Sequence, residues 1–343
     1  MDKRHIDEFL RDAIDANCRW LHIISGTTPV MQDRKGVKRF DCERLLSNEV
    51  YQIVDSFVDE SSKRKVLEGQ DVIVGYPFSP RYSARLSVYR QRGTLGVSGK
   101  LIETKVFELK ELGFLEPLID SWLNKRSGLY LICGTPDSGR STTQNAILQH
   151  LGSNHSWSMV QLDDVLEGEF PLFERSLLSR RTYDRDIVDF SLAVQSLMKA
   201  DVNVVALGDI NSLQRLEAAV RLASRGILVF GTFLSLDIEN TIHKITQMLS
   251  QSRELRGLLV SCLNGIYHQS FFTSSIGEPH LVKEALTMHP QPRKHLRDGN
   301  LASVLAFHKA GSKKDCIPYS RAFESLVTAG KLEASDVPLR YKV

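Results

Sequence analysis

Hydrophobic positions in the first third of the chain follow two different periods. Between residues 4 and 16 they fall three and four apart, which predicts a helix with one apolar face, and a second such face covers residues 45–57. Short apolar runs typical of strands occupy residues 20–25, 71–76, 85–89 and 94–102. This mixture predicts a small α+β domain over residues 1–103.

Beyond residue 128, strands and helices alternate regularly. An apolar face at helical spacing recurs at residues 140–151, 184–199, 213–224 and 238–249. Short continuous apolar runs predict strands at residues 129–133, 158–162, 203–207 and 227–232. Such runs between helices indicate an α/β domain over residues 128–343, with a mostly parallel sheet covered on both faces and a mostly helical C-terminal section.

The two patterned regions are joined by residues 104–127. This stretch has helical patterning, mixed charge and Gly113, but no strand pattern, so we place an interdomain linker there. A length of 343 residues agrees with two domains, since a domain averages roughly 150 residues.

Charge and cysteine content exclude several classes of function. The net charge of +3 is small and the basic residues are dispersed, so no nucleic-acid partner is predicted. The five cysteines are widely separated without a C-x-x-C pair, which indicates reduced thiols and no zinc or redox site. No run of ~18 apolar residues is present, and the N-terminus is too acidic for an export signal. We therefore expect a cytoplasmic protein without direct membrane insertion.

A near match to the phosphate-binding loop G-x-x-x-x-G-K-[ST] spans residues 134–142, with arginine in place of lysine. In such loops, backbone N–H groups and a helix N-terminus hold the phosphates, and the hydroxyl ligates Mg²⁺. ATP and Mg²⁺ are therefore the predicted cofactors, and an ordinary glycine-containing turn is the alternative. The candidate nucleotide-binding residues are Gly134, Asp137, Ser138, Gly139, Arg140, Ser141 and Thr142.

Two residues of this loop are unfavourable for efficient hydrolysis. Arg140 carries a planar, delocalised charge instead of the compact ammonium of lysine, so nucleotide binding is expected to survive better than catalysis. Asp137 brings a carboxylate close to the polyphosphate and repels it, although aspartate tolerates unusual backbone angles.

Taken with its flanking segments, the chain resembles the PilT and PilU type IV pilus retraction ATPases, within the type II and type IV secretion ATPases. The resemblance rests on L-H-I at residues 21–23, residues 85–93, L-K-E-L-G at 109–113, G-L-Y-L-I-C-G at 128–134 and G-I-L-V-F-G-T at 226–232. It implies a PAS-like N-terminal domain and a RecA-like P-loop ATPase domain. It also implies hexameric rings with nucleotide between subunits.

The resemblance implies catalytic or metal-binding roles for two aspartates at the ends of predicted strands. Asp163 stands where the family's I-E-D-P-x-E segment has a catalytic glutamate, and Asp209 replaces the glutamate of V-G-E-[IM]-R-D. Asp209 and Ser141 are accordingly the candidate Mg²⁺ ligands. The side chains of Asp163 and Asp209 are each one methylene shorter than the glutamates of the family. The alternative is that Asp209 caps the following helix, although Ser212 can do so alone.

Other family positions are matched less well. Arg85 and Arg92 stand where arginines act across the subunit interface, but charged residues on a strand also form solvated faces. Both histidines of the family's G-H-L-V-F-G-T-L-H-T motif are absent. Near the C-terminus, the retraction signature A-I-R-N-L-I is only echoed at residues 291–296, where Pro292 predicts a helix start.

Two functions follow from these matches and departures. One is a type IV pilus motor ATPase, a ring subunit that uses Asp163 and Asp209 for hydrolysis. The other is a hydrolysis-deficient accessory subunit of such a ring, and a type IVB secretion or conjugation ATPase is a further alternative. The expected partners are copies of this chain or a paralogous ATPase in a hexamer, and an inner-membrane pilus platform protein, which would make the location peripheral to the inner membrane.

Overall fold

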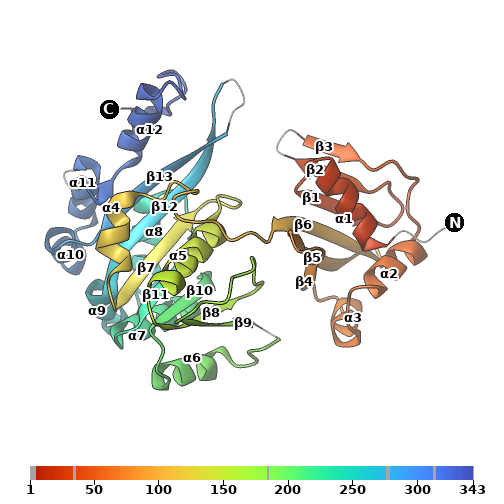
Figure 1. Ribbon diagram of the computed structural model, residues 1–343, viewed down its shortest axis with the longest axis horizontal. Coiled ribbons are helices and arrows are strands. Elements are labelled where there is room, and N and C mark those ends of the chain that lie inside the picture. Colours follow the sequence, from red (N-terminus) through yellow and green to blue (C-terminus); the bar gives the residue numbers. More distant parts are fainter. Residues whose placement is uncertain (1–4, 34–35, 184, 276–278, 312–313, 343) are drawn as a thin grey trace. The chain divides into compact units, whose positions relative to one another are not determined.

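The computed structural model describes residues 5–33, 36–183, 185–275, 279–311 and 314–342 (Figure 1). Contacts within the chain define two compact units. Unit 1 comprises Met1–Lys105 and Val165–Glu169, and unit 2 comprises Val106–Asp164 and Phe170–Val343.

Unit 1 is built on a six-stranded antiparallel sheet in the order β3-β2-β1-β6-β5-β4. The strands are β1 (Trp20–Ile24), β2 (Val30–Asp33), β3 (Gly36–Arg39), β4 (Val72–Pro77), β5 (Tyr82–Gln91) and β6 (Thr94–Glu103). The helices are α1 (Ile6–Asp15), α2 (Ser47–Asp55) and α3 (Glu60–Leu67). Apolar faces of α1 and the sheet share one core, in which Phe9 and Leu86 are fully buried.

Sequence patterns missed β2, β3 and α3 in this unit. Strand β3 is exposed at all its positions, and α3 buries only Val66, so neither carries the apolar period on which prediction depends. They form because tertiary pairing and an Asp59 N-cap compensate for weak local patterning.

Unit 2 contains an eight-stranded mixed sheet in the order β14-β13-β12-β7-β11-β10-β8-β9. The strands are β7 (Gly128–Gly134), β8 (Ser158–Asp163), β9 (Leu177–Thr182), β10 (Val204–Asp209), β11 (Leu228–Leu234), β12 (Leu263–Thr273), β13 (Pro279–Thr287) and β14 (Cys316–Ile317). Pairing is parallel from β12 to β9 and antiparallel among β12, β13 and β14. The α/β fold with a mostly parallel sheet is therefore confirmed.

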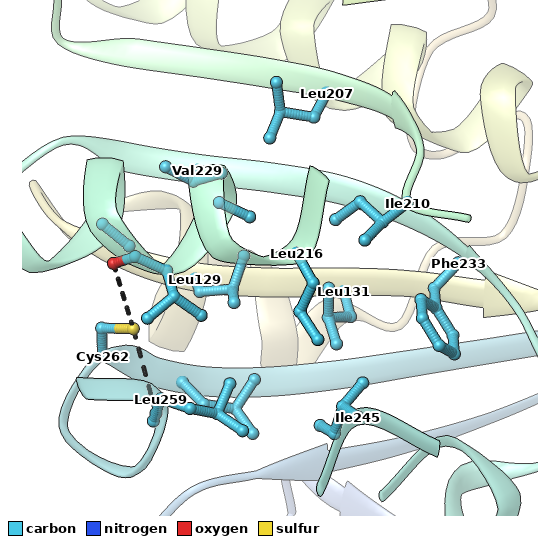
Figure 2. Close-up of a cluster of buried hydrophobic side chains, with 14 of the residues drawn as sticks. Leu129, Leu131, Leu207, Ile210, Leu216, Val229, Phe233, Ile245, Leu259 and Cys262 are labelled. Carbon is cyan, nitrogen blue, oxygen red and sulfur yellow. Dashed lines mark hydrogen bonds between the residues drawn. The ribbon is translucent and has the colours of Figure 1, made fainter. Parts of the chain in front are cut away.

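Helices cover both faces of this sheet. They are α5 (Arg140–Asn154), α6 (Phe190–Lys199), α7 (Leu213–Ser224), α8 (Ile238–Met248), α9 (Arg253–Cys262), α10 (Pro290–Arg297), α11 (Leu301–Ala310) and α12 (Tyr319–Thr328). Alternate residues of β7 enter different cores: Leu129 and Leu131 lie in the core shown in Figure 2, whereas Tyr130 and Ile132 lie in the other. Burial on both faces explains the unbroken apolar runs.

Several expectations change in unit 2, among them the helix predicted at residues 184–199, which begins at Phe190 after an Asp189 N-cap. Residues 106–127, predicted as linker, belong to unit 2 by their contacts, and the short helices α4 (Glu116–Leu118) and η1 (Ile119–Leu123) bury Trp122 there. The C-terminal section has the expected helices, but β12 and β13 were missed because polar residues interrupt their apolar positions. Helix α10 begins at Pro290 and not at Pro292.

No helix among the described residues is long and apolar enough to cross a membrane.

Candidate nucleotide-binding site

The loop between β7 and α5 has the backbone of an anion-binding turn. Gly134, Asp137 and Gly139 have φ values of 157°, 57° and 86°, a region that disfavours residues with a Cβ and that aspartate tolerates better than most. A Cβ at Gly134 would lie 2.3 Å from both Ser138 Oγ and the Gln269 carbonyl oxygen. Only glycine fits there without displacing backbone.

Strand β12 holds this loop in place. Buried Gln269 donates from Nε2 to the Ser138 carbonyl at 2.5 Å and accepts from Thr143 Oγ1 at 2.8 Å. The Ser235 N–H donates to the Gly134 carbonyl at 3.3 Å. The loop is thus fixed by a strand that sequence patterns did not reveal.

The loop and the start of α5 suit a polyphosphate. Helix α5 begins without a side-chain cap, so its first N–H groups and positive dipole end face the loop. Ser138 is 1% exposed, and its Oγ has no hydrogen-bond partner among the described residues. Arg140, Ser141 and Thr142 form the first turn of α5. A bound phosphate would satisfy these donors.

The two predicted acidic residues lie at the same edge of the sheet as the loop. Asp163 ends β8 and Asp209 ends β10, and β10 pairs in parallel with β8 and β11, which in turn pairs with β7. Carboxyl ends of parallel strands meet at one edge, where ligands of such sheets bind.

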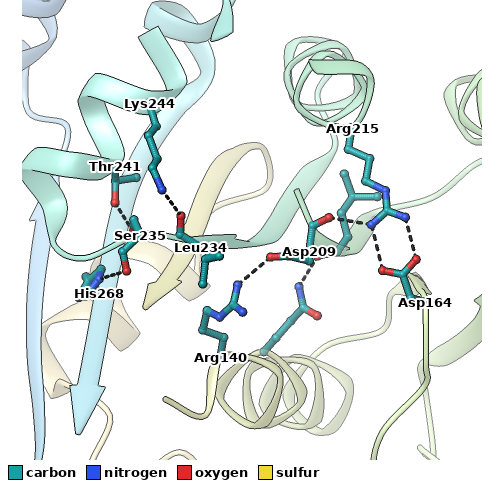
Figure 3. Close-up of polar contacts among 11 residues, drawn as sticks. Arg140, Asp164, Asp209, Arg215, Leu234, Ser235, Thr241, Lys244 and His268 are labelled. Carbon is teal, nitrogen blue, oxygen red and sulfur yellow. Dashed lines mark hydrogen bonds and ion pairs between the residues drawn. The ribbon is translucent and has the colours of Figure 1, made fainter. Parts of the chain in front are cut away.

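Arg140 and Asp209 form an ion pair across this edge (Figure 3). Arg140 Nη1 donates to Asp209 Oδ1 at 2.7 Å, with side-chain exposures of 17% and 34%. A short charge-assisted bond between half-buried groups neutralises both charges. The residue predicted to contact phosphate and the residue predicted to hold Mg²⁺ are therefore each other's partners.

Asp163 is packed against the end of β10. It is 8% exposed, and its Oδ1 accepts from the Asp164 N–H at 2.7 Å. A Cβ at Gly208 would lie 2.3 Å from that Oδ1, so a glycine is needed there for the carboxylate to occupy its position. The Asp163 carboxylate therefore lies against Gly208, the residue before Asp209 at the end of β10.

Arg215 is a site residue that the sequence analysis missed (Figure 3). Its Nη1 donates to the Asp209 carbonyl at 2.8 Å, and both terminal nitrogens reach the Asp164 carboxylate, at 3.1 and 2.8 Å. Its guanidinium also lies 4.3 Å from the ring centre of Tyr183. The helix dipole disfavours a positive charge in the first turn of α7, where Arg215 lies. This position is the feature of the sequence from which acidic partners could have been predicted.

The alternative in which Asp209 caps α7 is not observed. Ser212 is the N-cap, and its side chain accepts from the Arg215 N–H at 3.3 Å. The Asp209 side chain therefore does not cap the helix and pairs instead with Arg140 within the site.

A second missed residue, His268, lies beside Gln269 on β12. Its Nε2 lies 3.0 Å from the Ser235 carbonyl, which can only accept, so Nε2 carries the proton. Burial lowers the pKa of His268 to about 4, so the ring is neutral and Nδ1 accepts from the Tyr319 hydroxyl at 2.5 Å. This ring links the turn after β11 to α12.

The predicted arginines both belong to unit 1. Arg85 Nη2 donates to Glu167 Oε1 at 3.0 Å, and Arg85 Nε is buried without a partner among the described residues. Arg92 is exposed in the turn between β5 and β6, with φ of 50°. Arg85 is therefore more than a solvated surface charge, and the action of both residues on a neighbouring subunit stays a prediction.

Comparisons with known proteins agree with these features. Residues 100–291 match the model of the family described as Type II/IV secretion system protein. The chain is 21% identical to the type IV pilus retraction ATPase PilT of Pseudomonas aeruginosa over 98% of each chain. It is 21% identical to the type IV pilus ATPase PilU of the same organism over 96% of this chain and 87% of that one.

Solved structures give the same fold. The pilus retraction motor PilT with bound ADP has a TM-score of 0.83 at 24% identity and covers 97% of this chain and 96% of its own. The Legionella pneumophila ATPase DotB has a TM-score of 0.80 at 16% identity, over 98% and 95%. The resemblance stated from the sequence is confirmed.

Proposed function

Since the chain belongs to the type II/IV secretion system protein family, we propose that it is a nucleotide-binding ring subunit of a motor ATPase of the type IV pilus kind. The observation that carries this proposal is the loop at residues 134–142, which presents uncapped N–H groups beside Asp163 and Asp209. Near full-length similarity to PilT and PilU supports the pilus setting.

The proposed roles follow from position. N–H groups of the loop and of Ser141 and Thr142 bind phosphate oxygens, and Arg140 neutralises their charge. Bound Mg²⁺ would neutralise phosphate charge further, and Ser141 and Asp209 are the residues that would hold it. Asp163 orients and deprotonates the attacking water.

The ion pair between Arg140 and Asp209 must open for this arrangement to form. Arg140 has to turn toward phosphate while Asp209 releases it, so nucleotide binding and loss of the ion pair are coupled. The pair therefore competes with phosphate for Arg140 and with Mg²⁺ for Asp209, which lowers nucleotide affinity and slows hydrolysis without excluding binding.

This ion pair also supports a second candidate function. An accessory ring subunit that binds nucleotide and hydrolyses it slowly, beside an active paralogue, would keep the loop and lose catalytic efficiency. A type IVB secretion or conjugation ATPase, the further alternative from the sequence, has a fold that agrees with the DotB structure.

The proposed subunit acts as part of a hexameric ring. A hexamer of this chain, or a mixed ring with a paralogue, would place Arg85 and Arg92 against a neighbouring subunit's nucleotide. Such a ring would work in the cytoplasm against an inner-membrane platform protein.

Steady-state phosphate release by the purified full chain separates the candidates, with Asp209→Ala as the control. Turnover above that control supports the motor. A rate equal to the control, with saturable binding of a fluorescent ATP analogue, supports the accessory subunit. Absence of binding at millimolar nucleotide rejects both.

A further inference from the structure

Three side chains with metal-binding atoms meet at the edge of unit 2 formed by β13 and β14, apart from the nucleotide loop. They are His289, Asp315 and Cys316, and their ligand atoms lie within 4.8 Å of one another. His289 Nε2 is 2.9 Å from Asp315 Oδ1. Sequence spacing gave no hint of this cluster, because 26 positions separate His289 from Asp315.

Both segments are held in position by their neighbours. Cys316 pairs with Leu286 in the sheet. Thr287 Oγ1 accepts from Trp122 Nε1 at 2.8 Å and donates to the Asp315 carbonyl at 3.0 Å. These contacts fix the backbone on either side of the ligands, so that the three side chains are brought together before any metal binds.

Burial in the cluster is graded. Cys316 is fully buried, whereas the His289 and Asp315 side chains are 29% and 15% exposed. An ion bound there would be held from inside by sulfur and would keep one side open to water. An imidazole nitrogen, a carboxylate oxygen and a thiolate are ligands that suit Zn²⁺.

We propose that His289, Asp315 and Cys316 bind one Zn²⁺ ion, with water as the fourth ligand. On binding, the Cys316 thiol gives up its hydrogen bond to the Thr287 carbonyl, 3.6 Å long, and loses its proton to solvent, and the direct contact between His289 and Asp315 is replaced by two bonds to the metal. Tetrahedral Zn²⁺ places its ligands roughly 3.3–3.8 Å apart, so the histidine and carboxylate separate slightly and the sulfur moves inward.

Metal binding would strengthen the attachment of the short edge strand β14 to the sheet. β14 has two residues and pairs with β13 only at Ala285 and Leu286. A metal bond between Cys316 and His289 would fasten this strand, and with it the start of α12, to the end of β13. The occupied site would therefore stabilise the C-terminal part of unit 2.

The test is a titration of metal-free full-length chain with Zn²⁺ alone, against a chromophoric chelator and without nucleotide. We expect one ion per chain, and a loss of affinity of at least about tenfold in each of Cys316→Ser and Asp315→Asn. Cys42→Ser and His243→Ala, in residues outside the cluster, should bind as the unmodified chain does.

Cobalt substitution tests the sulfur ligand separately. The chain and Cys42→Ser should show thiolate-to-Co²⁺ charge-transfer absorption that Cys316→Ser lacks, while circular dichroism verifies that all three are folded. Equal zinc binding by the cluster variants and the unmodified chain, or no stoichiometric binding at all, would overturn the proposal, in which case the cluster is a hydrogen-bonded His–Asp pair beside a buried thiol.

Discussion

Arg140 and Asp209 satisfy each other's charge at 2.7 Å, so in the proposed function each residue reaches nucleotide or Mg²⁺ only by leaving the other. The competition between the ion pair and nucleotide depends on single side-chain atoms, so one substitution can remove it.

Asp209→Asn removes the carboxylate charge and nearly preserves its shape. Because Arg140 is released, we expect ADP without Mg²⁺ to bind several-fold more tightly, by roughly 1 kcal/mol, while any phosphate release falls to background. Fluorescent-nucleotide titration measures the affinity, and Asp201→Asn, at an exposed aspartate, is the matched control. Weaker ADP binding in Asp209→Asn would show that the ion pair does not compete with nucleotide.

Arg215 joins the two acidic segments through Asp164 and the Asp209 carbonyl. Arg215→Ala should lower unfolding stability by about 2 kcal/mol, since it removes half-buried charged hydrogen bonds. Arg215→Lys should recover only part of this, because an ammonium cannot bind the carboxylate with a planar fork. Arg221→Ala, which breaks a surface pair with Glu217 on the same helix, should cost at most ~0.5 kcal/mol. Chemical denaturation measures all three, and equal losses for the Arg215 and Arg221 variants would contradict a bridging role.

At the scale of elements, sequence patterns correctly located the helices and strands whose apolar residues follow a local period. They predicted the strand–loop–helix around residues 134–142, and helix α7 at residues 213–224, because capping, glycine stops and apolar runs act over a few residues. They missed β12, which carries Gln269 and His268 on opposite faces. Its polar residues serve tertiary contacts, and such contacts are invisible to a local period.

Two glycine substitutions test the loop against a helix. Gly134→Ala should destabilise the chain by about 2–4 kcal/mol, because its Cβ would collide with Ser138 Oγ and the Gln269 carbonyl. Gly257→Ala, inside α9 with no atom within 4 Å of the new Cβ, should stabilise it by about 0.5–1 kcal/mol. Thermal unfolding measures both, and a neutral Gly134→Ala would mean that the loop relaxes freely.

At the scale of the whole molecule, stability should depend on pH through a buried carboxyl group. Glu284 on β13 is 4% exposed, accepts from the Ile238 N–H at 2.7 Å, and lies 3.9 Å from His308 Nε2. Burial raises the pKa of Glu284 to about 8, from 4.5. A raised folded-state pKa means that this contribution to stability is complete below pH 4.5 and is lost as pH rises through about 8.

Glu284→Gln should remove that dependence. The variant and the unmodified chain should unfold at similar temperatures at pH 5, and the variant should be the more stable by roughly 5 °C at pH 9. Burial lowers the pKa of His268 and His308 to about 4, so both proteins should lose stability below pH 6.5. Calorimetry at a series of pH values measures the unfolding temperatures, with Glu239→Gln, at an exposed glutamate, as the control. If the unfolding temperatures of the Glu284→Gln variant and the unmodified chain changed in parallel at alkaline pH, Glu284 would not be the source of the pH dependence.

The five residues Val165–Glu169 have a consequence for how this chain can be divided. They follow directly on Asp163 and Asp164 but belong to unit 1, where Val165 packs against Gly75 and the Glu169 N–H donates to the Thr104 carbonyl. The polypeptide thus crosses between units three times, after Lys105, Asp164 and Glu169. Unit 1 therefore cannot be exchanged by recombination at a single junction after Lys105, because a foreign segment in place of residues 1–105 must also accommodate a pentapeptide encoded further along the gene.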